Sequence, residues 1–268
     1  MKKKINYKDK FYSIASIILT IVLLLYITSS YNKRIVVVRD FPEIMQKGKI
    51  NIVTEYNSID YYLAGDTIAG LQYDICKYIE KRSGLEADIF VENNMDICIN
   101  GLENKTYDII ARNIPVTNEK KKLLLFTIPI TQSKLVLIQR KPFPDDSFSL
   151  IRNQIDLAYK EVYVPKKSAA ILRLRNLSEE IAEPIYIKEI EDYSAEQLIG
   201  MVANSQIDYA VVDKELASKN SELYPEIDSE TDISFTHFQA WAVRKSSPVL
   251  LDSLNIWLSD FKKEHLQD

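Results

Sequence analysis

Apolar and polar positions recur at two different periods along the chain, and each period predicts a type of element. After residue 48, short β-branched runs alternate with segments whose apolar residues recur at helical spacing. The predicted strands of this first block are Lys49–Thr54, Glu86–Val91, Tyr107–Ala111 and Leu135–Ile138, and its predicted helices are Leu71–Arg82 and Asp96–Leu102. The helix ending at Arg82 precedes Ser83-Gly84, which is typical of a helix C-cap.

The segment Lys141–Ser147 is polar and rich in proline, and we interpret it as an internal boundary. The alternation restarts beyond it, with strands at Ile155–Tyr159, Pro184–Lys188, Ile207–Val212 and Ser234–Val243 and helices at Ser168–Leu177, Ser194–Ala203, Lys214–Asn220 and Pro248–Lys263. Two blocks of this kind predict two α/β lobes with mostly parallel sheets. A cleft between two lobes is a common place for a small ligand to bind.

The first thirty residues differ from the rest of the chain. Five lysines among residues 2–10 precede Phe11–Ile27, a run of seventeen residues without a charge. A basic segment before an apolar run predicts export with the lysines left in the cytoplasm. We expect residues 1–30 to be an uncleaved signal anchor that crosses the inner membrane once through residues 11–28, with the C-terminal body in the periplasm. The alternative is a cleaved signal and a soluble periplasmic protein. Residues 31–48 are predicted to be a tether or short leading element that Pro42 breaks.

Composition narrows the function classes. The 268 residues include 34 basic and 38 acidic ones, and without residues 1–30 the numbers become 29 and 37, a net charge of −8. This acidic balance argues against nucleic acid as a partner. Two cysteines and two histidines argue against a disulfide scaffold and a typical zinc cluster. The motifs GxGxxG, GxxxxGK[ST] and GxSxG do not occur, so we expect no metal, no cofactor and no catalytic residue.

The stretch Leu102–Ile130 resembles the family-3 extracellular solute-binding proteins of the polar amino acid type. Its landmarks are Leu102, Asp108-Ile-Ile, Thr117-Asn-Glu-Lys120, Phe126-Thr127 and Pro129, and two further ones are Gly70-Leu-Gln-Tyr-Asp74-Ile and Ile207-Asp-Tyr-Ala-Val-Val-Asp213. They occur in order over roughly residues 49–263.

Within that family, Gln239–Arg244 and Tyr61-Tyr62-Leu63 look most like the sensing module of F-type membrane-bound lytic transglycosylases. Those enzymes carry a lysozyme-like domain after this module. Here the chain stops at Asp268, so we expect the sensing module without the catalytic domain.

The resemblance implies a two-lobed Venus-flytrap fold, the α/β fold of type 2 periplasmic binding proteins, preceded by the membrane helix. Lobe 1 would consist of residues 49–139 and 235–268, and lobe 2 of residues 140–234 as one insertion. The two chain crossings would form a hinge for closure around a ligand. We expect the strands near Leu135–Ile138 and Ala240–Val243 to lie side by side there.

The resemblance also implies roles for residues at the cleft. Asp213 falls where the family holds the α-ammonium of the ligand, although an aspartate at this position also caps a helix. Lys120 replaces the usual arginine of the α-carboxylate site and offers no bidentate fork. Arg112, after a strand end, could supply the missing guanidinium or form a surface ion pair. Asn113 follows at a position where the family offers polar groups.

Five further residues are predicted at the cleft. Glu55 and Tyr56 follow the first strand at the cleft edge, and Tyr61 with Tyr62 is predicted to form an aromatic wall. Ser168 begins a helix of lobe 2, where its hydroxyl could meet an anion or simply cap the helix.

Three functions stay open from the sequence. The first is a non-catalytic module that binds or senses an amino-acid-like, peptide-like or cell-wall-fragment ligand, with a transporter or envelope protein as a possible partner. The second is an enzyme, either a remnant transglycosylase or a dehydratase-like member of the fold. The third is a partner protein of an envelope complex whose cleft is vestigial, which the loss of the arginine at Lys120 favours over the enzyme.

Overall fold

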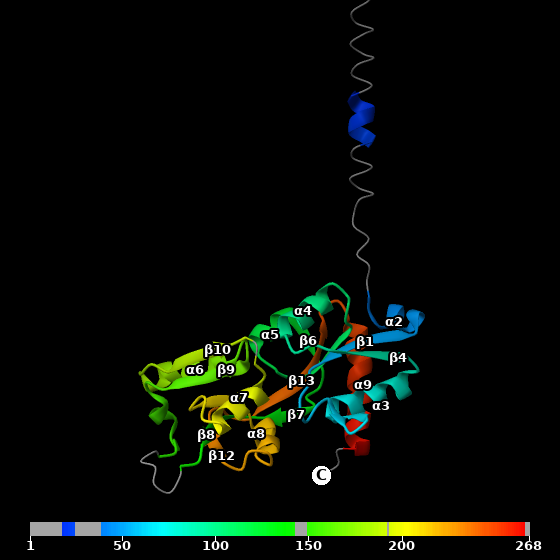
Figure 1. Ribbon diagram of the computed structural model, residues 1–268. Helices are drawn as coiled ribbons and strands as arrows, with labels where there is room; N and C mark the ends of the chain where they lie inside the picture. Colours follow the sequence, from blue (N-terminus) through cyan, green and yellow to red (C-terminus); the bar gives the residue numbers. More distant parts are fainter. Residues whose placement is uncertain (1–17, 25–38, 143–148, 192, 266–268) are drawn as a thin grey trace, which may run out of the picture. The chain divides into compact units, whose positions relative to one another are not determined.

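The computed structural model describes residues 18–24, 39–142, 149–191 and 193–265 (Figure 1). It divides into two units, residues 1–38 and a body that begins at Arg39. In the first unit, residues 18–24 form a helix with exposed apolar side chains. The rest of the anchor that we expect at residues 11–28 lies outside the described residues. Among the described residues, no helix combines the length and the apolar character needed to cross a membrane.

The body contains a first sheet whose strands run in the order β4-β1-β5-β13-β6, with β7 paired to β13. The strands are β1 (Lys49–Thr54), β4 (Glu86–Val91), β5 (Ile109–Pro115), β6 (Leu124–Phe126), β7 (Thr131–Ser133) and β13 (His237–Arg244). Strands β4, β1 and β5 are parallel, and β13 returns antiparallel to β5. We refer to this sheet and its helices as lobe 1.

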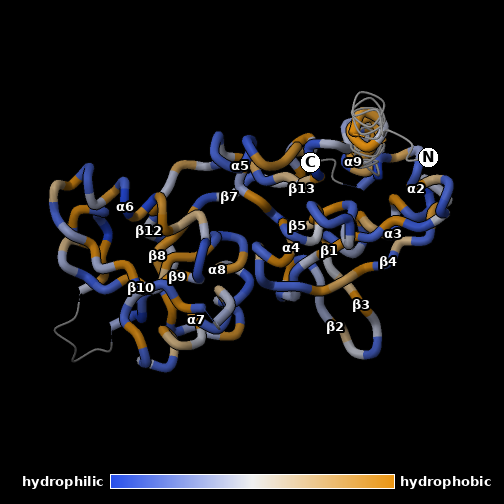
Figure 2. The backbone as a smooth tube through the Cα atoms, turned by 90° about the horizontal axis from the view of Figure 1, so that it is seen from above, coloured by the Kyte–Doolittle hydropathy of each residue, from blue (hydrophilic) through white to orange (hydrophobic). Residues whose placement is uncertain are grey.

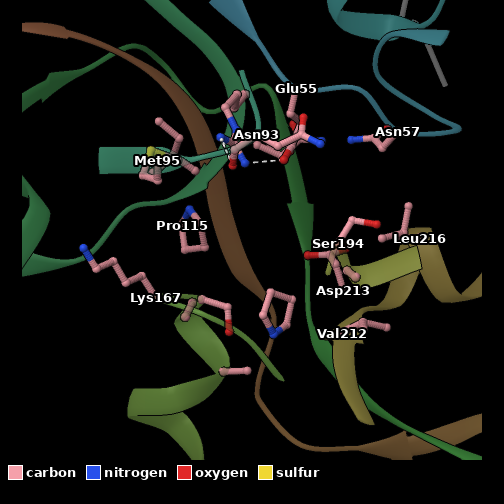
Figure 3. A pocket seen from close by; sticks show the side chains of 18 of the residues that line it. Glu55, Asn57, Asn93, Met95, Pro115, Lys167, Ser194, Val212, Asp213 and Leu216 are labelled. Atoms are coloured by element: carbon pink, nitrogen blue, oxygen red, sulfur yellow. Dashed lines mark hydrogen bonds and ion pairs between the residues drawn. The ribbon is translucent and has the colours of Figure 1, made fainter. Parts of the chain in front are cut away.

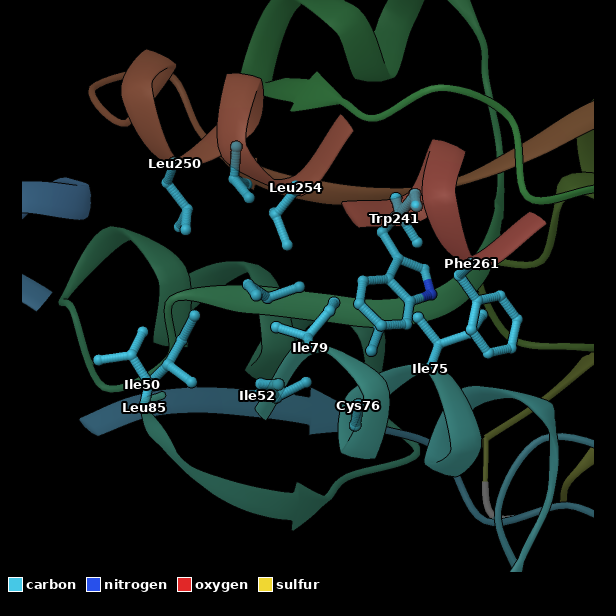
Figure 4. Packing of buried hydrophobic residues seen from close by; sticks show 14 of the residues in the cluster. Ile50, Ile52, Ile75, Cys76, Ile79, Leu85, Trp241, Leu250, Leu254 and Phe261 are labelled. Carbon is cyan, nitrogen blue, oxygen red and sulfur yellow. The ribbon is translucent and has the colours of Figure 1, made fainter. Parts of the chain in front are cut away.

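Helices cover both faces of the first sheet because its strands alternate apolar side chains between two cores. The helices are α2 (Phe41–Lys47), α3 (Leu71–Ser83), α4 (Met95–Glu103), α5 (Asn118–Leu123) and α9 (Pro248–His265), and a small hairpin joins β2 (Tyr62–Ala64) to β3 (Thr67–Ala69). Ile109 packs with α2, α3 and α9, whereas Ile110 packs with α4. Trp241 is fully buried among Ile75 and Phe261 in the first of these cores (Figure 4).

The second sheet has the strand order β10-β9-β11-β8-β12. Its strands are β8 (Leu135–Arg140), β9 (Glu161–Pro165), β10 (Tyr186–Ile190), β11 (Ala210–Asp213) and β12 (Ile227–Asp232), and its helical segments are η1 (Gln154–Leu157), α6 (Ala169–Ile181), α7 (Ala195–Ala203) and α8 (Lys214–Asn220). Strands β9, β10 and β11 are parallel, and β8 is antiparallel to both of its neighbours. We refer to this part as lobe 2. Figures 1 and 2 both place α6, β9 and β10 far from α2 and α9. Hydrophobic positions recur along the strands of both lobes (Figure 2).

The chain crosses between the two sheets at Lys134 and again at residues 233–236. Beside the crossings, β7 pairs with β13 through Ser133 and His237. The expectation that Leu135–Ile138 and Ala240–Val243 lie side by side is therefore wrong. The two chain segments separate directly after the Ser133–His237 pair, so that β8 enters the second sheet while β13 stays in the first.

Pro42 does not interrupt the secondary structure, contrary to the sequence interpretation. It lies in the first turn of α2, where a proline has no hydrogen bond to lose. Asp40 and Glu43 form a capping box on this helix, and Ile44 is fully buried against α9 and β1. Residues 39–47 are thus part of the packed body.

Candidate functional site

A cavity of about 490 Å³ lies between the two lobes. Strand ends and loops of lobe 1 line one side, and the starts of α6, α7 and α8 line the other. Figure 3 shows Glu55 and Asn57 on the lobe 1 side and Ser194 and Asp213 on the lobe 2 side. Seven predicted site residues line this cavity: Glu55, Tyr56, Arg112, Asn113, Lys120, Ser168 and Asp213.

Asp213 ends β11, caps α8 and lies on the cavity lining, so the capping role is confirmed. Its carboxylate accepts hydrogen bonds from the Ser133 hydroxyl, from Gln239 Nε2 at 2.7 Å and from the Glu215 amide at 3.3 Å. Ser133 and Gln239 belong to the paired strands β7 and β13 beside the crossings. The carboxylate is therefore fixed between lobe 2 and the crossing strands while it faces the cavity.

Arg112 is held within lobe 1. Its Nη2 donates to Glu55, and its Nη1 lies 3.0 Å from the carbonyl oxygen of Asn93. Burial raises the pKa of Glu55, and the charge of Arg112 opposes that rise. A guanidinium already paired with a carboxylate is a poor anchor for a second one, so the structure does not support Arg112 as a free substitute for the family's arginine.

Lys120 is the remaining cation near this side of the cavity. It lies on α5, which Thr117 caps, and its side chain is half-buried. Burial lowers the pKa of Lys120, and the neighbouring charge of Arg112 lowers it further. Within the part of the chain that the structure describes, Lys120 has no ion pair, unlike Lys167, which pairs with Asp96.

Asn113 contacts Asp60, a cavity residue that the sequence interpretation missed. Its Nδ2 donates at 3.0 Å to the carboxylate of Asp60, which also accepts from Gln72 and Asn57. Asp60 is 3% exposed, and burial raises its pKa. It lies in an irregular loop after β1, where neither periodicity nor a motif marks it.

The two tyrosines of the predicted aromatic wall do not line the cavity. Tyr61 packs edge to face against Tyr73, with ring centroids 5.9 Å apart, and Tyr62 lies in the β2–β3 hairpin. A bridge between Asn57 and Tyr61 closes the loop that brings Asp60 to the cavity. Tyr56, in contrast, is on the lining and half exposed.

Ser168 and His237 both line the cavity, and each has a buried polar atom without a partner among the described residues. These atoms are the Ser168 hydroxyl oxygen and His237 Nε2. Ser168 stands at the N-cap of α6 yet makes no capping hydrogen bond, whereas Ser194 caps α7 through a capping box with Gln197. A polar ligand could satisfy the free groups of Ser168 and His237.

Besides the hydrogen bonds of Ser133 and Gln239 to Asp213, further polar contacts join the described parts of the two lobes. The Ser58 amide donates to Glu196 at 2.8 Å, and Lys167 of lobe 2 forms an ion pair with Asp96 of α4. These contacts bring parts of the two lobes together beside the cavity. In the described ranges, no group of three or more His, Cys, Asp or Glu side chains is placed to hold a metal ion.

Comparisons with known proteins agree with this architecture. The chain is 28% identical to a membrane-bound lytic murein transglycosylase F of Desulfosudis oleivorans over 223 residues, which are 82% of this chain and 47% of the relative. It is also 28% identical to the protein of that name in Aeromonas salmonicida, over 84% of this chain and 44% of the relative. The chain therefore spans less than half the length of these relatives.

Solved structures show the same fold. The holo form of ArgBP from T. maritima superimposes with a TM-score of 0.71 and 22% identity, over 83% of this chain and 94% of that one. An amino acid transporter substrate-binding protein from Streptococcus pneumoniae, bound to L-arginine, has a TM-score of 0.71 and 18% identity over 84% and 93% of the chains. Residues 48–268 match the bacterial extracellular solute-binding proteins, family 3, and the chain belongs to that family.

Proposed function

We propose that this chain is a binding or sensing module that takes a zwitterionic ligand between its lobes and performs no chemistry on it. The ligand class would be an amino acid, a peptide or a peptide-bearing cell-wall fragment. The observation that carries the proposal is the placement of Asp213 on one side of a cavity between the lobes that also presents Lys120 and the free hydroxyl of Ser168.

Charge-assisted hydrogen bonds would fix such a ligand at both ends. An α-ammonium would bind Asp213, because a carboxylate in a water-poor cleft is stabilised by a cation. An α-carboxylate would lie between Lys120 and the uncapped start of α6 at Ser168. The amino-acid ligands of the structural neighbours and the cell-wall enzymes among the relatives support this class.

We further propose that the module is held at the inner membrane by residues 11–28, with the body in the periplasm. The lysine-flanked apolar run and the names of the membrane-bound relatives support this placement. An envelope or transporter partner would then bind preferentially to the closed state of the lobes.

The second candidate is a partner protein with a vestigial cleft. It is favoured by one observation, which is the pairing of Arg112 with Glu55. Among the described residues, this pairing leaves Lys120 as the only unpaired cationic side chain that could bind the carboxylate of a ligand.

A thermal-shift screen with amino acids, dipeptides and muropeptides separates the two candidates. A ligand at 100 times its dissociation constant stabilises the folded state by about 2.7 kcal/mol, a shift that is easily measured. We expect a ligand to stabilise the original chain, and we expect Asp213→Asn to abolish this stabilisation. The control variant Asp208→Asn changes an exposed aspartate outside the cavity lining and should keep the stabilisation. Stabilisation by none of these compounds would favour the vestigial cleft.

A further inference from the structure

The carboxylates on the cavity lining outnumber the cations that could neutralise them. Asp60 is buried, and among the described residues the side chains that donate to it are neutral amides, with Asn57 Nδ2 at 2.8 Å, Gln72 Nε2 at 3.0 Å and Asn113 Nδ2 at 3.0 Å. Asp213 likewise accepts from neutral donors. Such hydrogen bonds orient both carboxylates without neutralising their charge.

A series of close polar contacts links the two carboxylates across the lobes. Asn113, which donates to Asp60, has its Oδ1 3.4 Å from Thr131 Oγ1. The same hydroxyl lies 2.9 Å from Gln239 Oε1, and Gln239 Nε2 donates to Asp213 at 2.7 Å. Because Asp60 belongs to lobe 1 and Asp213 to lobe 2, this connection holds two negative charges near each other when the lobes are closed.

Glu215 adds a third negative charge to the same region. It lies two residues after Asp213 in the first turn of α8, on the cavity lining. Burial raises the pKa of Glu215 to about 6, and the charges of Asp213 and Asp60 raise it as well. In the described part of the chain it forms no ion pair.

Almost every cation on the lining is already paired. Three cations have carboxylate partners, in the pairs Arg112–Glu55, Lys166–Glu191 and Lys167–Asp96. Lys120 alone has none among the described residues, and it faces the carboxylate end of the proposed site. The cavity therefore keeps an excess of negative charge after a single α-ammonium has bound Asp213.

We propose that the ligand carries a second cationic group besides its α-ammonium, and that this group lies between Asp60 of lobe 1 and Glu215 of lobe 2. The inference rests on the proposed function and names its substrate class: diamino acids, arginine-like amino acids, or peptides with a basic side chain. Without the second cation, closing the lobes brings like charges together and desolvates them, which is costly. A cation between them offsets this cost, so that it binds the closed state better than the open one.

Two pairs of nearly isosteric amino acids test the charge directly. Citrulline has the shape of arginine without its charge, and norleucine has the chain of lysine without its ammonium. Isothermal titration of the 268-residue chain at pH 7.5 should give affinities at least tenfold higher for arginine than for citrulline and for lysine than for norleucine. Equal or tighter binding of the neutral members would overturn the inference and leave the proposed function standing. Binding of none of the four amino acids, together with no stabilisation by any compound of the thermal-shift screen, would overturn both.

The variant Asp60→Asn tests whether the second cationic group of the ligand lies beside Asp60. Asp60→Asn keeps the shape of the side chain and should reduce the preference for arginine over citrulline to less than threefold, with citrulline affinity changed little. Asp156→Asn, an exposed change outside the cavity lining, should leave the preference intact. If Asp60→Asn fails to fold by circular dichroism, Glu215→Gln, on the opposite lobe, serves in its place. An undiminished preference in the folded variant would contradict the proposed position.

Discussion

The carboxylate of Asp108 and the guanidinium of Arg39 form a bidentate ion pair, with Nε 2.7 Å from Oδ1 and Nη2 2.6 Å from Oδ2. Arg244 donates to the same carboxylate, and the amide of Asn51 lies 3.0 Å from Oδ2. Asp108 is fully buried and Arg244 is 5% exposed. One aspartate at the start of β5 therefore joins the first residues of the body to β1 and to the end of β13.

We expect Asp108→Asn to destabilise the body strongly. The variant leaves two arginines with an uncompensated charge, and breaking a buried ion pair typically costs about 3–5 kcal/mol. Urea unfolding followed by circular dichroism measures this difference. Glu86→Gln serves as the control, because its pair with Lys49 is exposed and a pair of that kind contributes about 1 kcal/mol or less. Similar midpoints for the two variants would contradict the structural role of Asp108.

The second prediction concerns Arg112 and Glu55. If Arg112 acts mainly as the partner of Glu55, Arg112→Met should destabilise the protein because it leaves a half-buried carboxylate unpaired. Adding Glu55→Gln should recover part of that loss. Urea unfolding of the two single variants and the double variant gives the coupling between them. Additive effects within about 0.5 kcal/mol would instead indicate that the two residues act independently.

The fold could be anticipated from the sequence because its elements follow strong local signals. Periodicity and caps predicted the strands and helices around α3, α7 and α9, and the resemblance at Asp108 supplied the family, which the comparison confirmed. The motif that carries the resemblance contains Asp108, which is fully buried and forms ion pairs with both Arg39 and Arg244.

The missed features depend on contacts between residues far apart in sequence. Asp40 caps α2 and also accepts hydrogen bonds from the amides of Val249 and Leu250 at the start of α9. No local pattern predicts a cap supplied from 209 residues away. Asp60 was missed for the same reason, since its partners Gln72 and Asn113 lie on other elements.

The third prediction is a pH dependence that arises from Glu215. Its pKa is about 6 in the folded chain and 4.5 for the free side chain, so the folded state holds the proton more tightly. Stability contributed by the protonated form is therefore lost as pH rises from about 4.5 through 6. Glu215→Gln should remove this part of the pH dependence and should be the more stable protein at pH 7.5, by about 1 kcal/mol or less because solvent screens the partly exposed side chain. Urea unfolding at pH 4.5, 6 and 7.5 measures the difference, and a constant gap between the two proteins would contradict it.

The last prediction concerns the contact between the Ser58 amide and Glu196, which joins the lobes at 2.8 Å. Glu196 has no ion pair in the described residues, so its contribution to closure comes from accepting this hydrogen bond. Glu196→Ala removes the acceptor, and loss of one hydrogen bond of about 0.5–1.5 kcal/mol should shift the balance between closed and open lobes by about twofold to tenfold. Small-angle scattering of the ligand-free chain should then show a larger radius of gyration.

The control for that experiment separates the hydrogen bond from the charge. Glu196→Gln keeps an oxygen acceptor at the same position while it removes the negative charge. If the hydrogen bond holds the lobes together, Glu196→Gln should scatter like the original chain and only Glu196→Ala should open. If repulsion among the cavity carboxylates dominates instead, both variants should be more closed than the original chain, because each removes one negative charge from the lining. The two mechanisms thus predict opposite changes in the radius of gyration for Glu196→Ala.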